Sequence, residues 1–366
     1  MKHINELESS LSAHLGWNKS RISCLSRMVL AMIAVRTVNL VDIACAFGGG
    51  QTKVLSNYRR LQRFFSGFDF CYTELASLLF GLFPMQGKIY LSMDRTNWLW
   101  GQSPINILML SLVYKGTAIP IYWSMVYTKG NSNTATRIEL IDRFIRHFGT
   151  ECVAGLLCDR EFVGKEWFEY LKRVKMAFYI RIKANALVTN SRGQTVNVRM
   201  LFLGLKQRQE RVLKGTRKIY GIDVFLVGVR CDDGEQLIVA SSEENAQAIS
   251  VYRLRWEVET LFSCLKGRGF RFEDTHMSDP DRIQKLVAVL AIAFAWSHRV
   301  GEWRHDGKEP IKVKKHGRLA KSLFRHGLDF IREILFIGKF SLAQFRQCLS
   351  QLTPVRRWEQ SKRVVL

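Results

Sequence analysis

The segment KIYLSMD, residues 88–94, marks the point where the sequence changes from helical to strand-like patterning. Residues 89–93 form a short apolar run that predicts a buried strand ending at Asp94, and residues 153–158 form a second run that ends at Asp159. Open α/β sheets place their ligands at the carboxyl ends of their strands, where two neighbouring aspartates can share hard divalent cations. Aspartate also ends strands as a turn former, so this pair alone leaves both interpretations open.

The segments between and after these two strands occur in a defined order. Residues 106–114 and 118–127 are apolar runs joined by residues 115–117, which predicts a hairpin. Residues 134–148 have helical periodicity, and residues 162–174 predict a further helix after Asp159. Three strands, a helix, a strand and a helix match the element order of a ribonuclease-H-like α/β sheet. The order is an analogy that favours this fold without establishing function.

Residues 252–266 predict a helix with one polar face. With Tyr252 at zero and about 100° per residue, Arg255, Glu259 and Lys266 fall at about 300°, 340° and 320°. Glu257 falls near 140° by the same rule, on the opposite side, which makes it the poorer metal ligand. The face can complete a metal site and grip phosphates. The alternative is a solvated face with an ordinary Arg255–Glu259 pair.

The charge of the chain favours a polyanionic partner. The 366 residues contain 55 Lys and Arg against 32 Asp and Glu, a formal net charge of +23, and the excess is spread along the sequence. Nucleic acid is the usual partner of such a protein. Lys53, Arg59, Arg60 and Arg63 make one predicted helix basic, after a break at residues 48–50. This spacing is compatible with a DNA-binding helix in a groove or with an ordinary helical hairpin.

The polar helix carries a resemblance to a known family. The spacing Tyr-x2-Arg-x3-Glu-x6-Lys, filled by Tyr252, Arg255, Glu259 and Lys266, resembles the YREK signature of DDE transposases of the insertion-sequence-four family. The phrases MDRTNW at 93–98 and CDREF at 158–162 look like the two catalytic aspartate blocks of that family, and KGRGF at 266–270 continues the likeness. The likeness extends from about residue 30 to residue 340. Three blocks in the right order are far more specific than any one of them.

The resemblance implies a function and a role for each matched residue. Asp94, Asp159 and Glu259 would coordinate two Mg²⁺ or Mn²⁺ ions, and Tyr252, Arg255 and Lys266 would contact DNA phosphates near the transposon end. The protein would bind terminal inverted repeats and perform cut-and-paste cleavage and strand transfer as a homodimer, with no nucleotide cofactor. The tryptophan that relatives stack on a flipped base during hairpin formation has no counterpart between Trp167 and Trp256. Any aromatic face can stack on a base, so Tyr220, Phe225 and Phe202 are the candidate replacements.

We expect three regions. These are a helical DNA-binding domain at 1–85, a ribonuclease-H-like catalytic domain at 86–300 with a β-rich insertion at about 177–248, and a helical C-terminal region at 301–366 for DNA contact or dimerisation. The N-terminus lacks a secretory h-region, and the longest apolar run, residues 286–296, is too short to span a bilayer. We therefore expect a cytoplasmic, nucleoid-associated protein with no membrane partner.

Two other functions are compatible with the sequence. A catalytically silent DNA-binding protein derived from a transposase would keep the basic charge, although the retained acidic trio counts against it. A ribonuclease-H-like nuclease would cut DNA without joining it. Cleavage and strand-transfer assays separate these alternatives from a transposase.

Overall fold

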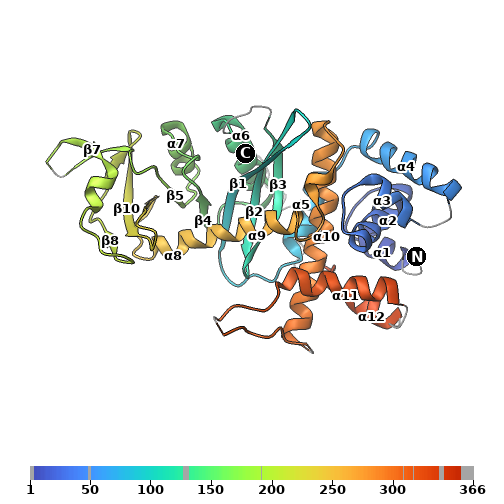
Figure 1. Ribbon diagram of the computed structural model, residues 1–366. Helices are drawn as coiled ribbons and strands as arrows, with labels where there is room; N and C mark the ends of the chain where they lie inside the picture. Colours follow the sequence, from blue (N-terminus) through green and yellow to red (C-terminus); the bar gives the residue numbers. More distant parts are fainter. Residues whose placement is uncertain are drawn as a thin grey trace. The chain divides into compact units, whose positions relative to one another are not determined.

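The computed structural model describes residues 4–47, 51–126, 132–190, 192–307, 309–315, 317–337 and 342–355. The predicted break at 48–50 lies outside these residues. The chain folds into two compact units, and Figure 1 shows their elements. Unit 1 comprises Met1–Pro84, Asn97–Ile105 and Leu261–Leu366, and unit 2 comprises Met85–Thr96 and Asn106–Thr260. The domain boundaries expected at residues 85 and 300 stay predictions.

The core of unit 2 is a five-stranded part of a larger sheet. Its strands stand in the order β3-β2-β1-β4-β5, with β2 and β3 antiparallel and with β1, β4 and β5 parallel. This is the ribonuclease-H-like sheet that the order of elements predicted. The bounds are β1 (Ile89–Trp100), β2 (Ser103–Tyr114), β3 (Thr117–Met125), β4 (Val153–Cys158) and β5 (Phe178–Arg181).

Two helices accompany this sheet in unit 2. Helix α6 (Thr134–Phe148) begins where the Asn133 side chain accepts a hydrogen bond from the backbone N–H of Thr136, a standard N-cap. Its apolar face, including Ile141 and Phe144, is fully buried. Helix α7 (Lys165–Arg173) follows β4 and contacts α6. Strands β2 and β3 are buried along almost their whole length, as strands covered on both faces are.

The sheet continues into the β-rich segment. Strand β5 lies at the start of the region expected as a β-rich insertion, pairs parallel with β4 and pairs antiparallel with β11 (Gln236–Ser241). The insertion expected to be β-rich is not all strand, because Val198–Phe202 is a 3-10 helix whose Val198 and Phe202 side chains are both fully buried. The remaining strands are β6 (Leu187–Thr189), β7 (Thr195–Asn197), β8 (Glu210–Val212), β9 (Arg217–Ile219) and β10 (Ile222–Arg230).

The helix predicted at 252–266 is interrupted by a tighter turn. Helix α8 (Ala248–Arg253) leads into the 3-10 turn η2 (Leu254–Trp256), and α9 (Glu257–Leu265) follows directly. The backbone at Leu254 and Glu257 stays right-handed helical, so the polar face keeps its general direction. The turn shifts the residues after Trp256 relative to an ideal wheel, because a 3-10 helix turns faster than an α-helix.

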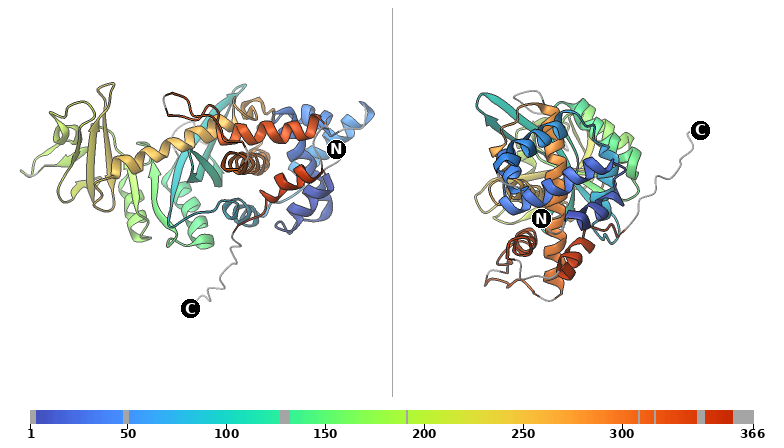
Figure 2. Two further views of the ribbon diagram at one scale, coloured as in Figure 1. Left: turned by 90° about the horizontal axis from the view of Figure 1, so that it is seen from below. Right: turned by 90° about the vertical axis from the view of Figure 1, so that its right-hand side faces the viewer.

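Unit 1 is helical and is built on the buried helix α10 (Pro280–Asp306). Helix α11 (Leu323–Ile337) crosses α10 closely, as Figures 1 and 2 show. Two glycines permit this approach: a Cβ at Gly301 would lie 1.8 Å from the Leu323 carbonyl oxygen, and one at Gly327 would lie 1.9 Å from that of Ser297. The other elements are α1 (Ile4–Ser12), α2 (Lys19–Val35), α3 (Leu40–Ala46), α4 (Gln51–Ser66), α5 (Tyr72–Gly81), η3 (Phe272–Asp274) and α12 (Leu342–Ser350).

Helix α10 is long and apolar enough to cross a membrane, judged by length and composition within the described residues. The bent pair α2 and α3 passes the same test only if the two helices are taken as one span. Of the most apolar window of α10, 89% is buried inside the protein, as the core helix of a soluble protein is.

Candidate active site

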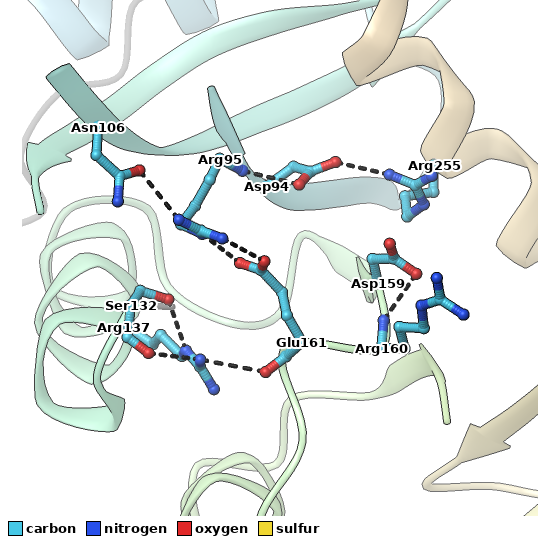
Figure 3. Close-up of polar contacts among 9 residues, drawn as sticks. All are labelled: Asp94, Arg95, Asn106, Ser132, Arg137, Asp159, Arg160, Glu161 and Arg255. Atoms are coloured by element: carbon cyan, nitrogen blue, oxygen red, sulfur yellow. Dashed lines mark hydrogen bonds and ion pairs between the residues drawn. The ribbon is translucent and has the colours of Figure 1, made fainter. Parts of the chain in front are cut away.

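The register of the parallel strands brings two aspartates together. Met93 of β1 pairs with Cys158 of β4, so Asp94 and Asp159 are the next residues on the two adjacent strands. Figure 3 shows both side chains at this edge. The prediction that the first strand ends at Asp94 is wrong, since β1 continues to Trp100 beside β2. What ends here is β4, and with it the parallel ladder that aligns the two aspartates.

Asp94 is largely but not fully buried and is bound to Arg255. The Arg255 Nη1 atom donates to Asp94 Oδ2 at 2.6 Å, and the backbone N–H of Arg95 donates to Oδ1 at 2.8 Å. The exposed fractions of the two side chains are 13% for Asp94 and 6% for Arg255. Burial raises the pKa of Asp94 to about 7, while the Arg255 charge opposes that rise. The desolvation of this carboxylate is therefore only partly offset by one guanidinium.

Asp159 is held by Tyr252. The phenol O–H of Tyr252 donates to Asp159 Oδ1 at 3.3 Å, and the backbone N–H of Arg160 donates to the same oxygen at 2.7 Å. Tyr252 is only 2% exposed and belongs to the core beneath the sheet. Burial raises the pKa of Tyr252, so the phenol stays protonated and acts as a hydrogen-bond donor.

Glu259 completes the group from the helical side. Its carboxylate lies 3.5 Å from Arg255 Nη1, and its side chain is 50% exposed. Arg255 thus contacts both Asp94 and Glu259. As the described side chains stand, no three His, Cys, Asp or Glu residues are close enough together to hold a metal ion. In the described structure Arg255 contacts Asp94 and Glu259, and Tyr252 contacts Asp159. The three carboxylates are linked by these contacts and not by direct contact with one another.

Comparison with known proteins assigns the family. The model of the transposase DDE domain matches residues 91–296, which is more than half of the chain and includes all three carboxylates. The chain belongs to the DDE transposase family. No curated protein matches this transposase in sequence. A solved structure described as a piggyBac transposase synaptic complex with hairpin DNA is similar at a TM-score of 0.46 and 13% identity, covering 92% of this chain and 77% of that one. A likeness this weak does not bear on the site.

Glu257 of the transposase has a structural contact away from the aspartates. The backbone N–H of Gly116, in the β2–β3 turn, donates to Glu257 Oε1 at 3.1 Å. Burial raises the pKa of Glu257 to about 7. This carboxylate fastens the start of α9 to the β2–β3 hairpin, whereas Glu259 contacts Arg255.

Lys266 belongs to unit 1 and contacts its own surroundings there. Its Nζ lies 2.9 Å from Glu273 Oε1 and donates to the Asn97 carbonyl oxygen at 3.3 Å. The ammonium also lies 5.4 Å from the centre of the Trp98 ring. With 22% of the side chain exposed, Lys266 keeps part of its charge open to solvent.

An ion pair that the sequence patterns did not predict joins the two aspartate blocks. Arg95 donates to both carboxylate oxygens of Glu161, Nε at 2.5 Å and Nη2 at 2.7 Å, and its Nη1 donates to Asn106 Oδ1 at 3.2 Å. The Glu161 carbonyl oxygen also accepts from the buried Arg137 at 3.2 Å (Figure 3). We call the Arg95–Glu161 pair the clamp. The signal was present, because Arg95 directly follows Asp94 in MDR and the oppositely charged Glu161 stands two residues after Asp159 in CDRE.

Trp256 is a second residue of the site region for which no role was predicted. It is 62% exposed, and its ring lies 5.4 Å from the Arg255 guanidinium carbon. Among the three aromatic residues proposed for base stacking, Phe202 is fully buried, while Tyr220 and Phe225 are half-buried. Phe202 is packed against Gly228, so it is not accessible to a base.

Proposed function

We propose that this transposase is a cut-and-paste enzyme of the insertion-sequence-four family, which binds terminal inverted repeats and performs metal-dependent strand cleavage and strand transfer. The observation that carries the proposal is the grouping of three carboxylates. Asp94 and Asp159 follow the same register pair of two parallel strands, and Glu259 shares Arg255 with Asp94. The family match covers all three residues.

The donor set fits divalent cations. Carboxylate oxygens are the ligands preferred by Mg²⁺ and Mn²⁺. A guanidinium already occupies the space between Asp94 and Glu259, so this place favours positive charge. Asp94, Asp159 and Glu259 would hold the ions. Two bound cations would supply activation of the attacking oxygen and stabilisation of the leaving oxygen at the scissile phosphate.

The remaining residues of the signature would orient the reactants. Tyr252 fixes the rotamer of Asp159 through its hydrogen bond. Among the described residues, the buried Nε of Arg255 finds no hydrogen-bond partner, so a phosphate oxygen at the site can take this donor. We propose that Lys266 contacts a phosphate through its exposed charge and that Arg255 contacts another, whereas the buried Tyr252 supports phosphate binding by holding Asp159.

A tyrosine-recombinase route is disfavoured by the surroundings of Tyr252. A nucleophilic tyrosine must reach the phosphate and lose its proton. Tyr252 is 2% exposed, and burial raises its pKa, which disfavours the phenolate. A metal-assisted displacement without a covalent protein intermediate and without a nucleotide cofactor is the mechanism that the carboxylates support.

The partners follow from charge and reaction geometry. A net charge of +23 suits binding to DNA, and Lys53, Arg59 and Arg63 are exposed along α4. We propose that α4 contacts the terminal repeats, that two copies pair the transposon ends, and that α12 serves that homodimer. The protein would work in the cytoplasm on nucleoid DNA. If the reaction passes through a hairpin, Trp256 offers an exposed aromatic face beside Arg255 for a displaced base.

The test is Mg²⁺-triggered cleavage of DNA that carries the ends flanking the encoding gene. Asp94→Asn, Asp159→Asn and Glu259→Gln should each lower cleavage by at least about 10³-fold while end binding persists, since the ions lose a ligand. Glu257→Gln is the matched control: it lies two residues from Glu259 but contacts the β2–β3 turn, so it should cleave normally.

Each other outcome points to a different function. Full cleavage by any one of the three variants would remove that residue from the site. Binding without cleavage by the unmodified protein would favour a silent DNA-binding protein. Cleavage without joining of precut ends would favour a nuclease.

A further inference from the structure

Four arginine side chains from three distant segments interact in unit 1, those of Arg36, Arg271, Arg325 and Arg332, and Arg268 contacts Arg36 through its backbone carbonyl oxygen; we call these five residues the arginine cluster. Arg36 caps the end of α2, Arg268 and Arg271 lie in the loop after α9, and Arg325 and Arg332 lie on α11. Two hydrogen bonds join these segments. Arg36 Nη2 donates to the Arg268 carbonyl oxygen at 2.9 Å, and Arg332 Nε donates to the Ala34 carbonyl oxygen at 3.2 Å.

The loop that carries Arg268 and Arg271 is fixed in place. Its Phe270 ring packs against Phe324 at 5.7 Å between centroids, directly before Arg325 in the chain. The backbone N–H of Arg271 donates to the Lys266 carbonyl oxygen at 2.8 Å. The arginine positions are therefore set by packing and backbone contacts, which lowers the entropy lost when they bind a ligand.

The positive charge of the cluster is poorly balanced. The pKa of Arg36 is lowered by burial first, and then by Arg325 and Arg332, with Asp329 opposing and Arg271 adding to the shift. Asp329 is already paired with Arg325 at 2.8 Å. Glu333, the other acid of α11, lines a separate cavity with Trp303 and Arg304. Bases thus outnumber acids around Arg36, an arrangement that a bound anion would stabilise.

Two further features indicate a ligand. Within the described residues, the buried Nε of Arg36 has no hydrogen-bond partner. Arg36 and Arg271 also have positive φ angles of 58° and 51°, in the left-handed region that is unfavourable for residues other than glycine. Such conformations persist where the surrounding structure enforces them, and they concentrate at functional sites.

We propose that the arginine cluster is a DNA-binding site separate from the carboxylates, where guanidinium groups bind consecutive phosphates of duplex DNA. The inference rests on the proposed function only in taking DNA as the partner. Guanidinium groups match phosphate geometry and stay charged when partly buried. The cluster contains arginine only, and its contacts would be to the backbone, so it binds duplex DNA regardless of sequence.

The test measures binding of a fluorescent DNA duplex to the full-length protein without Mg²⁺, over a range of salt concentrations. The variants are Arg268→Gln, Arg325→Gln and Arg271→Asn, alone and combined. Arg268→Gln keeps the backbone carbonyl that Arg36 uses, and asparagine tolerates the left-handed backbone of Arg271. Each lost phosphate contact should lower the slope of log K against log salt by about 0.9, for end DNA and unrelated duplex alike.

The control is Arg346→Gln, an exposed arginine of the same unit that pairs with Glu6 on α1. It should leave the slope unchanged. Thermal melting of every variant checks that the fold persists, and Arg271→Asn alone decides the matter if the combined variant does not fold.

The proposal is supported by a lower slope in the cluster variants with an unchanged slope in the control. An unchanged salt slope in folded cluster variants would overturn the proposal. This holds even if those variants lose binding to an acidic protein, because the site would then serve a protein and not DNA. If those variants also cleave ends normally, the proposed function stands while this inference fails. If the unmodified protein binds no DNA, both fail.

Discussion

Arginine has opposite roles in the two units. In unit 2 the arginines beside the aspartates are paired with acids: Arg95 binds Glu161, and Arg255 binds Asp94 and contacts Glu259. In unit 1 the guanidinium groups of Arg271, Arg325 and Arg332 act on Arg36, and the acid that opposes them, Asp329, is already paired with Arg325. A balanced network orients side chains, because its charges are already satisfied, whereas an unbalanced one retains capacity for an anion. We therefore expect that removing a paired arginine or its acid in unit 2 impairs catalysis, and that removing arginines of the cluster in unit 1 impairs DNA binding.

The largest expected effect comes from filling the close crossing of α10 and α11. Gly327→Ala would place a Cβ 1.9 Å from the Ser297 carbonyl oxygen, so the helices must separate. We expect a loss of more than about 3 kcal/mol in the free energy of unfolding, since backbone must move. Because α11 carries Arg325 and Arg332, any folded fraction should also bind DNA with a lower salt slope.

Gly267→Ala is the matched control for this change. A Cβ at Gly267 meets nothing within 4 Å, although the residue lies in the loop of the arginine cluster. Denaturant melts of both variants measure the difference. Equal stability of the two would contradict the tight helix crossing.

The next effect concerns the clamp. Glu161→Gln removes the carboxylate charge that pairs with Arg95, and solvent moderates the loss because 16% of the Arg95 side chain is exposed. We expect a decrease in cleavage of about 10- to 100-fold, as for partners that orient metal ligands, and a higher Mg²⁺ concentration for half-maximal rate. A purely structural role would lower stability without moving that Mg²⁺ requirement.

A double-mutant cycle with Arg95→Gln measures the clamp itself. The coupling energy should be roughly 0.5–3 kcal/mol, because the two side chains share two hydrogen bonds. DNA-binding slopes should not change in any of the three variants. Additive effects on stability would show that the pair contributes nothing as a pair.

The smallest effect is expected at Trp256. Trp256→Ala removes a ring that is 62% exposed, so the free energy of unfolding should change by less than about 0.5 kcal/mol. First-strand cleavage should persist. If a hairpin forms, its yield should fall, because stacking contributes roughly 1–3 kcal/mol per base. Gel analysis of both products distinguishes the steps, and an equal loss in each would argue against stacking.

Local patterns were sufficient for much of the fold, while the choice of Asp94, Asp159 and Glu259 as metal ligands stays a prediction. The apolar runs before Asp94 and Asp159 predicted parallel strands, and helical spacing separated Glu259 from Glu257. The extension of β1 to Trp100 was not predictable, because it depends on pairing with β2 after β4 has ended. The 3-10 turn η2 was not predictable for a similar reason, because tertiary packing and not sequence periodicity decides where a helix tightens.

No local sequence pattern could have predicted the arginine cluster. Arg36, Arg268 and Arg325 lie in segments far apart in the chain, and only the packing of α2, the 266–271 loop and α11 brings them together. The two residues of the clamp could have been singled out from the sequence, because Arg95 and Glu161 stand inside the two aspartate motifs. Their pairing still required the β1–β4 register.

The central claim is that Asp94, Asp159 and Glu259 jointly hold the catalytic cations. Electron paramagnetic resonance can count Mn²⁺ ions bound to the full-length protein on precut end DNA. We expect two bound ions per active site in the unmodified protein and in Glu257→Gln, and fewer in Asp159→Asn and Glu259→Gln. The same Mn²⁺ count and affinity in the carboxylate variants as in the unmodified protein would contradict it.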